Sequence, residues 1–164
     1  MNTLPDIEFS EALIRRFDKL GPRYTSYPTA DRFHAEFTEH TYREYLEQRK
    51  RPADQNPPLS IYVHLPFCQS LCYFCACNKI ITQDRSRTTE YLRYLAKEMA
   101  GVAQHLGPGR RTAQLHFGGG TPTFLPPEEI DRLAAAIHRH FKFAPDSENS
   151  VEVDPRRLTK EHVE

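Results

Sequence analysis

The chain has 164 residues, and its 22 lysines and arginines balance its 22 aspartates and glutamates, which leaves no net charge when the eight histidines are neutral. A length near 150 residues favours one domain and is enough to bury a real core. No apolar run approaches the roughly 18 residues of a membrane-spanning helix, and the N-terminus lacks a basic stretch followed by an apolar core. With its balanced charge, the chain is not expected to bind membranes or nucleic acid.

Residues 1–58 are predicted to form an N-terminal segment of two helices, an arm and a connector. Residues 10–20 combine a serine N-cap with apolar residues on one helical face, and a second short helix is expected over 41–49. Residues 21–37 have neither helix nor strand periodicity and are interpreted as an ordered arm. Residues 50–58 are polar and rich in proline, as expected of a connector.

Strands and helices alternate over residues 59–164, which we expect to be the first βα units of a larger domain. The expected strands are 59–65, 113–117 and 150–154, the expected helices are 89–106 and 127–141, and Thr159 is the expected N-cap of a third helix. This order implies right-handed crossovers and a parallel sheet. Three parallel strands do not close a barrel and leave a flank of the sheet uncovered. The predicted fold class is therefore α/β, as the N-terminal part of a larger domain.

All four cysteines lie within ten consecutive residues, at Cys68, Cys72, Cys75 and Cys77. A disulfide framework would spread its cysteines along the chain, so this cluster predicts a metal centre and a reducing, cytoplasmic environment. The first three cysteines have the spacing C-x3-C-x2-C on the loop that leaves the first strand. Thiolates suit iron–sulfur clusters, and a four-iron cluster held by three cysteines leaves one iron open for a substrate or cofactor.

Structural zinc bound by four cysteines is the alternative interpretation of this loop. Zinc sites usually separate two pairs of ligands by a dozen or more residues, which disfavours zinc here. The role of Cys77 stays open on ligand chemistry alone. Because Cys77 follows Cys75 by only two residues, its reach around a cluster is awkward, and we interpret it as a nearby non-ligand.

A second candidate element is the glycine turn of residues 116–123, which leaves the second strand at the same edge of the sheet. It matches neither the dinucleotide-binding pattern nor a P-loop, but its glycines would let the backbone approach a ligand closely. The alternative is an ordinary flexible turn. Glu152 and Tyr62 alternate with apolar neighbours on their strands, so both are expected to point away from the helices, into a barrel lumen. His64 and His116, near strand ends, fit either substrate contacts or structural hydrogen bonds.

The cysteine loop, with aromatic Phe74 before the third cysteine, resembles the signature of the radical S-adenosylmethionine (SAM) superfamily, and the glycine turn resembles that superfamily's SAM-binding turn. The resemblance implies a partial (β/α) TIM-like barrel, here preceded by a helical N-terminal arm. It also implies that the open iron binds SAM through its amino and carboxylate groups. Reduction of the cluster then cleaves SAM to methionine and a 5′-deoxyadenosyl radical.

Four segments together narrow the resemblance to oxygen-independent coproporphyrinogen III oxidases, over about Gly21 to Arg157. They are GPRYTSYPTA, YVHLPFCQSLCYFCACNK, LHFGGGTPTFL and VEVDPR. The family usually has glycine where this chain has Ala76. The resemblance implies a [4Fe–4S] cluster and two SAM molecules per active site. It assigns Cys68, Cys72 and Cys75 to the cluster. It also assigns Tyr62, Gly119 and Glu152 to the first SAM molecule, and Phe74, Gly120 and Thr121 to the second.

The implied reaction converts two propionate side chains of coproporphyrinogen III to vinyl groups and gives protoporphyrinogen IX. The arm would close over the tetrapyrrole, with Arg23 pairing with a substrate carboxylate. A low-potential electron donor and a monomeric state are expected. Two alternatives remain, a radical SAM haem chaperone and an inactive metal-binding fragment; the arm and the fourth cysteine disfavour the first. We expect the isolated chain to be inactive or to misfold.

Overall fold

The structure is a computed structural model that describes residues 10–19, 29–50 and 57–163. The chain divides into two compact units, Met1–Thr38 and Glu39–Glu164. In the first unit, helix α1 (Glu11–Phe17) begins where the Ser10 hydroxyl accepts a hydrogen bond of 3.1 Å from the Leu13 N–H. The helix expected over 10–20 is therefore confirmed but is shorter. The arm is described only from residue 29 on, where a single 3-10 turn, η1, spans Ala30–Arg32.

The second unit alternates strands and helices in the expected order. Its elements are α2 (Glu39–Gln48), β1 (Leu59–Leu65), β2 (Phe67–Cys68), β3 (Ile80–Ile81), α3 (Ser86–Leu106), β4 (Arg111–Gly119), η3 (Pro122–Phe124), α4 (Pro127–His140), β5 (Lys142–Val151) and η4 (Lys160–His162). The third helix expected after Thr159 is only the 3-10 turn η4. The two-residue strands β2 and β3, which pair in parallel, were not expected.

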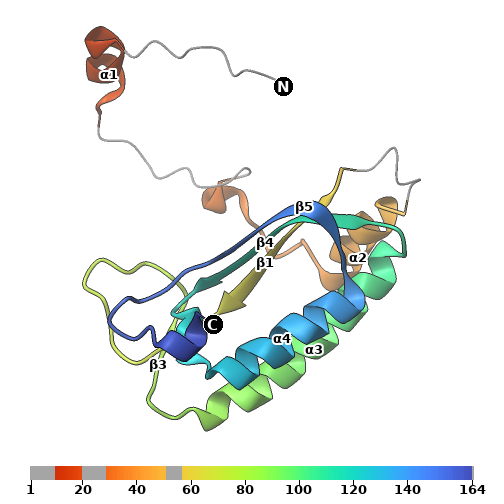
Figure 1. Cartoon of the computed structure of the whole chain (residues 1–164). Helices are drawn as coiled ribbons and strands as arrows, with labels where there is room; N and C mark the ends of the chain where they lie inside the picture. Colours follow the sequence, from red (N-terminus) through yellow and green to blue (C-terminus); the bar gives the residue numbers. More distant parts are fainter. Residues whose placement is uncertain (1–9, 20–28, 51–56, 164) are drawn as a thin grey trace. The chain divides into compact units, whose positions relative to one another are not determined.

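The main sheet has the order β1-β4-β5, and all of its strands are parallel, as predicted. Helices α3 and α4 run side by side along one face of this sheet (Figure 1). The core lies between the two layers, because the apolar side chains of the strands and the apolar stripes of both helices face each other. Its buried members are Val63, Leu65, Met99, Leu106, Leu115, Leu125, Leu133, Ile137 and Phe141.

The third strand differs from its expected position. It was expected over 150–154, yet β5 starts at Lys142 and ends at Val151. Most of β5 is polar and exposed at the edge of the sheet, and it contains Pro145, so the alternation that predicts a half-buried strand is absent. Glu152 therefore lies just past the strand, although its backbone N–H still donates to the Phe117 carbonyl at 2.9 Å.

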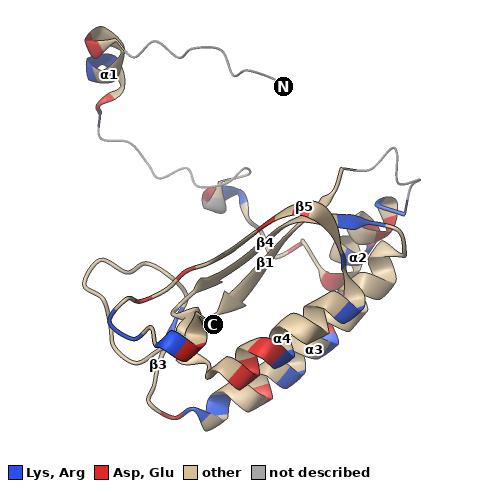
Figure 2. Cartoon of the chain, viewed as in Figure 1, with Lys and Arg blue, Asp and Glu red and all other residues tan. Residues whose placement is uncertain are grey.

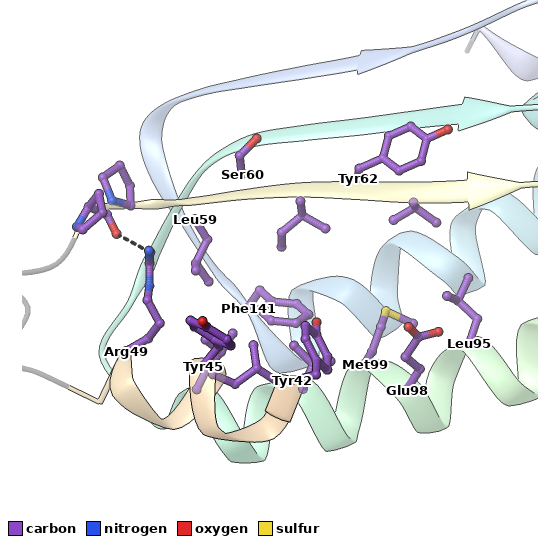
Figure 3. Close-up of a pocket in the computed structure, with 17 residues that line it drawn as sticks. Tyr42, Tyr45, Arg49, Leu59, Ser60, Tyr62, Leu95, Glu98, Met99 and Phe141 are labelled. Carbon is purple, nitrogen blue, oxygen red and sulfur yellow. Dashed lines mark hydrogen bonds between the residues drawn. The ribbon is translucent and has the colours of Figure 1, made fainter. Parts of the chain in front are cut away.

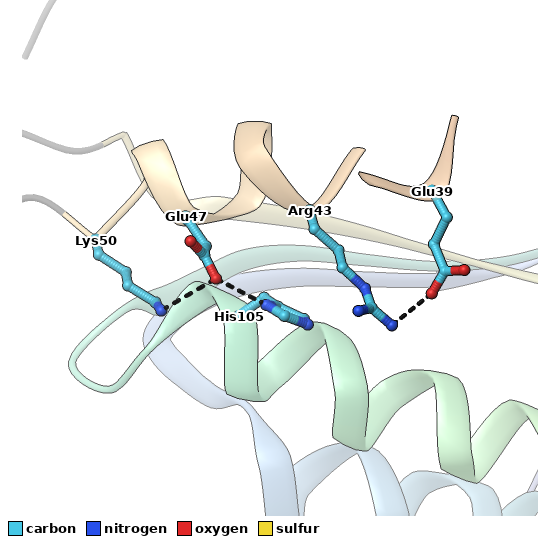
Figure 4. Close-up of polar contacts among 5 residues, drawn as sticks. All are labelled: Glu39, Arg43, Glu47, Lys50 and His105. Carbon is cyan, nitrogen blue, oxygen red and sulfur yellow. Dashed lines mark hydrogen bonds and ion pairs between the residues drawn. The ribbon is translucent and has the colours of Figure 1, made fainter. Parts of the chain in front are cut away.

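Helix α2 packs on α3 within the second unit. Glu47 joins the two helices, because its carboxylate lies 3.1 Å from the His105 ring and 3.7 Å from the Lys50 amine (Figure 4). The hydrogen bond to His105 lowers the pKa of Glu47 below its usual value, helped by the charge of Lys50. A second pair, Arg43 with Glu39, lies within α2 itself. None of the helices in the described part of the chain is long and apolar enough to cross a membrane.

Candidate functional site

The carboxyl ends of the three parallel strands meet at one edge of the sheet, where binding sites of α/β folds gather. The cysteine loop (residues 66–85) follows β1, and the glycine turn leaves β4 beside it. The two segments are joined by backbone hydrogen bonds, from Gly120 N–H to the Leu65 carbonyl at 2.8 Å and from Thr121 N–H to the Phe67 carbonyl at 2.9 Å. The structure thus brings together the two motifs that the sequence singles out.

Two glycines allow this close approach. Gly119 has a φ of 111°, and a Cβ there would lie 2.7 Å from the His64 ring. A Cβ on Gly120 would lie 2.7 Å from the Phe67 carbonyl oxygen and 2.8 Å from the Pro66 carbonyl group. Because these are backbone atoms, a side chain at Gly120 would push the cysteine loop away from the turn. The glycines of this turn are therefore required for its close packing against the cysteine loop.

The cysteine loop is tied to the sheet at both of its ends. At its start, Cys68 is buried, with its sulfur 3.6 Å from the Thr121 hydroxyl. At its end, the Asn78 carbonyl accepts a hydrogen bond of 2.9 Å from Nε2 of His64. The amine of Lys79 donates to the carbonyl groups of Cys75 and Cys77 at 3.3 and 3.2 Å. The sequence carries no pattern that would have predicted the contacts of Asn78 and Lys79.

The four thiols are all free, and the two at the end of the loop differ in character. The pKa of Cys75 lies below its usual value, chiefly because the backbone N–H of Cys77 donates to its sulfur. The pKa of Cys77 lies above its usual value, chiefly because its own thiol donates to Cys75. Of these two thiols, Cys75 therefore ionises more readily.

The donor set fits an iron–sulfur cluster by ligand type and spacing, since three soft thiols lie on one loop. Among the described residues, no three or more side chains of His, Cys, Asp or Glu are gathered closely enough to hold a metal ion. Binding of a cluster would therefore require the loop to bring the sulfur atoms of Cys68, Cys72 and Cys75 closer together.

Arg156 and Asp154 form an ion pair next to this loop. Nε and Nη2 of Arg156 donate to the two carboxylate oxygens of Asp154 at 2.9 and 2.8 Å. These bonds raise the pKa of Arg156 above its usual range, and a hydrogen bond to Cys72 adds to the effect. They also lower the pKa of Asp154. Asp154 therefore holds the guanidinium group of Arg156 in a fixed position beside the cysteine loop.

The sheet face away from the helices carries a chain of polar contacts, as the alternation of residues predicts. The rings of Tyr62 and His116 stack with their centres 5.8 Å apart. His116 lies 2.8 Å from the Ser150 hydroxyl and 3.4 Å from the Glu152 carboxylate. The other carboxylate oxygen of Glu152 accepts a hydrogen bond of 3.2 Å from the Gly119 N–H. Three predicted SAM contacts are thus brought together, because Glu152 binds Gly119 directly and reaches Tyr62 through His116.

The two histidines on this face have structural hydrogen bonds. Nε2 of His64 must carry the proton that it donates to the Asn78 carbonyl, so its Nδ1 accepts from the Tyr62 hydroxyl at 3.0 Å. Burial, with the nearby charge of Glu152, raises the pKa of Tyr62.

The other predicted site residues lie elsewhere. Thr121 lies beside Cys68, Phe74 is 90% exposed, and Arg23 lies outside the described residues.

A cavity of about 700 Å³ lies away from this edge (Figure 3). It runs along β1 between α2 and α3, and residues such as Tyr42, Tyr45 and Met99 line it. In Figure 3, Ser60 and Tyr62 lie on the other side of β1 from Leu59 and Met99. No cysteine lines this cavity, so its size does not make it the candidate site.

The chain matches the radical SAM superfamily over residues 62–164. It is 44% identical over 155 residues to the oxygen-independent coproporphyrinogen III oxidase of Pseudomonas aeruginosa, covering 93% of this chain and 33% of that protein. The corresponding protein of Mannheimia haemolytica is 41% identical over 152 residues, which cover 93% of this chain and all of that sequence. The chain spans about a third of the length of the Pseudomonas relative.

A solved structure is also similar to this chain. Coproporphyrinogen III oxidase from Escherichia coli, described as a radical SAM enzyme, matches with a TM-score of 0.74 and 42% identity, over 93% of this chain and 32% of that chain. The α/β class with a parallel sheet is thereby confirmed. Since both the superfamily match and the Mannheimia relative cover most of the chain, the chain belongs to the oxygen-independent coproporphyrinogen III oxidase family of the radical SAM superfamily.

Proposed function

We propose that the carboxyl edge of the sheet holds a [4Fe–4S] cluster and SAM, and that the protein acts in the oxidative decarboxylation of coproporphyrinogen III to protoporphyrinogen IX. The observation that carries the proposal is the contact between the cysteine loop and the glycine turn, with Cys68 against Thr121. It is supported by relatives that are named oxygen-independent coproporphyrinogen III oxidases. The chain spans about a third of the length of those relatives.

In this proposal, Cys68, Cys72 and Cys75 hold the cluster. The chemistry that the bound cluster supplies is the reductive cleavage of SAM to methionine and a 5′-deoxyadenosyl radical. The low pKa of Cys75 favours the thiolate that a ligand must provide. The hydrogen bonds of Lys79 and His64 to the end of the loop would limit its movement and so keep the three sulfur atoms near the turn.

The polar face beside the cluster would hold the first SAM through Tyr62, Gly119 and Glu152. Glu152 already accepts a hydrogen bond from the Gly119 N–H and lies beside His116, so its carboxylate is fixed in orientation before any ligand arrives. Such a carboxylate can accept hydrogen bonds from ribose hydroxyls or an ammonium group. Phe74, Gly120 and Thr121 are proposed to contact a second SAM, with the exposed ring of Phe74 free to cover it.

The reaction removes one hydrogen atom from each of two propionate side chains. Loss of CO₂ and of one electron to an acceptor then leaves a vinyl group in place of each propionate. Arg23 is proposed to pair with a carboxylate of the tetrapyrrole, a low-potential electron donor to reduce the cluster, and the protein to act as a monomer. The three-stranded sheet is proposed to be part of a partial TIM-like barrel, with its polar face lining the lumen.

Because the isolated chain is expected to be inactive towards coproporphyrinogen III, the test is the partial reaction, which is SAM cleavage by the anaerobically reconstituted chain in the presence of dithionite. We expect 5′-deoxyadenosine and methionine to form in equal amounts. Cys72→Ser should abolish both products, whereas Ser70→Ala, a change in the same loop that removes no thiol, should retain them. Formation of neither product by a chain that carries iron and sulfide would contradict the proposal.

A further inference from the structure

A second cavity lies at the carboxyl edge, next to the proposed cluster site but separate from the polar face. Its volume is about 310 Å³, and it is bordered by the cysteine loop, the turn after β4 and the segment that follows β5. Gly119, Glu152 and Tyr62 do not line it. Two residues with a proposed role, Cys72 and Thr121, form part of its wall, whereas Arg85, Thr123 and Arg157 line it without any proposed role.

The lining of the cavity is strongly basic. Arg85, Arg156 and Arg157 line it, and Asp154 is its only carboxylate. Both oxygens of Asp154 are bound by Arg156, whereas Arg85 and Arg157 form no ion pair with a carboxylate in the described part of the chain. Figure 2 shows the basic residues, in blue, on the loop after β5 and at the start of α3. The Arg85 guanidinium lies 5.9 Å from the centre of the Phe124 ring, a contact that uses its face and not its N–H groups, so the N–H groups of Arg85 and Arg157 can bind an anion.

A buried hydroxyl adds a second, independent observation. Thr123 lines the cavity and is only 6% exposed, yet its Oγ has no hydrogen-bond partner among the described residues. A buried polar group without a partner is unfavourable, and such groups in native proteins usually have one. His162, at the other wall, is already occupied, because Nε2 donates to the Leu125 carbonyl and Nδ1 accepts from the Thr159 hydroxyl. Thr123 therefore remains a buried hydroxyl without a partner, and rotation of its side chain would let it donate to a ligand in the cavity.

We propose that this cavity binds an oxyanion, the carboxylate or phosphate group of a small molecule, held by Arg85 and Arg157 and by the hydroxyl of Thr123. Three arginines exclude a cation, and an apolar ligand would leave the polar lining unpaired. Guanidinium groups match the paired oxygens of carboxylates and phosphates. The small volume of about 310 Å³ and the buried hydroxyl favour a small group over the surface of a macromolecule.

The test is calorimetric titration of the cluster-free 164-residue chain with sodium propionate and, separately, with inorganic phosphate, at constant ionic strength adjusted with chloride. We expect saturable binding of at least one of the two anions. Arg157→Gln and Thr123→Val should each weaken that binding by about tenfold or more. Arg93→Gln changes an arginine of α3 that pairs with Glu90 and does not line the cavity, so binding should be unchanged.

The two anions separate the sources of the ligand. Binding of propionate alone assigns the site to a carboxylate, and binding of phosphate alone assigns it to a phosphate ester. Binding of neither anion to a chain with a folded circular dichroism spectrum would overturn the proposal, as would binding that Arg157→Gln and Thr123→Val leave unchanged. Because the test needs no cluster and no SAM, its failure would leave the proposed function untouched. Thr123→Val loses only an unpartnered hydroxyl, so we expect it to fold.

Discussion

At the scale of single residues, Gly120 determines how closely the cysteine loop approaches the glycine turn. A Cβ at this position would lie 2.7 Å from the Phe67 carbonyl oxygen and 2.8 Å from the Pro66 carbonyl group. Since backbone atoms of the neighbouring loop would have to move, we expect Gly120→Ala to lower the free energy of unfolding by about 1–3 kcal/mol, measured by urea denaturation. The variant should also take up less iron, because β2 carries Cys68.

Gly101→Ala is the matched control for Gly120→Ala. Gly101 lies within α3, and a Cβ there would meet no atom within 4 Å. Alanine is the better helix former, so this change should raise the free energy of unfolding by about 0.5–1 kcal/mol. If both variants were equally stable, close packing of the turn against the loop would be refuted.

Glu152 contacts both the glycine turn, through the Gly119 N–H, and the polar face of the sheet, through His116. We expect Glu152→Gln to raise the dissociation constant for SAM about tenfold, because a charge-assisted hydrogen bond becomes a neutral one. The measurement is equilibrium binding of SAM to the reconstituted chain. Glu148→Gln is the control, since Glu148 bonds to Gln114 on the same face, farther from the turn, and its loss should leave SAM binding unchanged. An equal effect of both variants would contradict the role of Glu152.

At the scale of elements, a buried carboxylate links the first turns of α3 and α4. Glu129 is 6% exposed and accepts a hydrogen bond of 2.8 Å from the fully buried hydroxyl of Thr88. We expect Thr88→Val to lower the free energy of unfolding by about 1–3 kcal/mol, because it leaves Glu129 short of a donor.

Thr89→Val is the control for this link. Thr89 is exposed, and its hydroxyl lies 3.4 Å from Glu129, so the change should stay within about 0.5 kcal/mol. Urea denaturation at pH 7 measures both variants. A loss in Thr89→Val as large as that in Thr88→Val would show that the buried contact does not hold the two helices together.

The contact of α2 with α3 should weaken in acid. The pKa of Glu47 is lowered in the folded chain, so its stabilising effect is present above the unfolded value of 4.5 and is lost as the pH falls through the lower, folded value. We expect Glu47→Gln to speed the hydrogen exchange of α2 amides at pH 7, and to differ little from the unchanged chain near pH 3.

Glu44→Gln changes a glutamate of the same helix that pairs with His40 and not with α3. It should therefore leave the exchange of α2 nearly unchanged at either pH. Faster exchange in Glu44→Gln than in Glu47→Gln would mean that the helix frays by itself, without separating from α3.

The elements could be predicted from sequence only where burial imposes a pattern. The bounds of β1 agree with the prediction, because Leu59 to Leu65 alternate with polar residues and Pro66 follows. Strand β5 has no such pattern, since its polar residues lie at an edge and its register with β4 shifts between Thr112 and Gln114. The cysteine loop and the glycine turn could be placed at one edge, because parallel strands end together. The bonds of His64 to Asn78 and of Lys79 to the loop could not, because they depend on the path of an irregular segment.

At the scale of the whole molecule, the sheet of the second unit has two unlike faces. The helices cover one face. On the other face, His116 contacts both Tyr62 and Glu152. Both motifs lie at the carboxyl edge of this sheet, beside the polar face. This arrangement is what a site needs if a reactive ligand is to be held by polar groups above a rigid core. We propose that three cysteines at this edge hold a cluster with one open iron.

The most direct measurement is analysis of iron, sulfide and zinc in the anaerobically reconstituted chain, with electron paramagnetic resonance of the reduced sample before and after SAM is added. We predict about four iron and four sulfide per chain, a spectrum that changes with SAM, loss of the cluster in Cys75→Ser and its retention in Cys77→Ser. One zinc per chain without sulfide would contradict the account, as would a spectrum that SAM leaves unchanged.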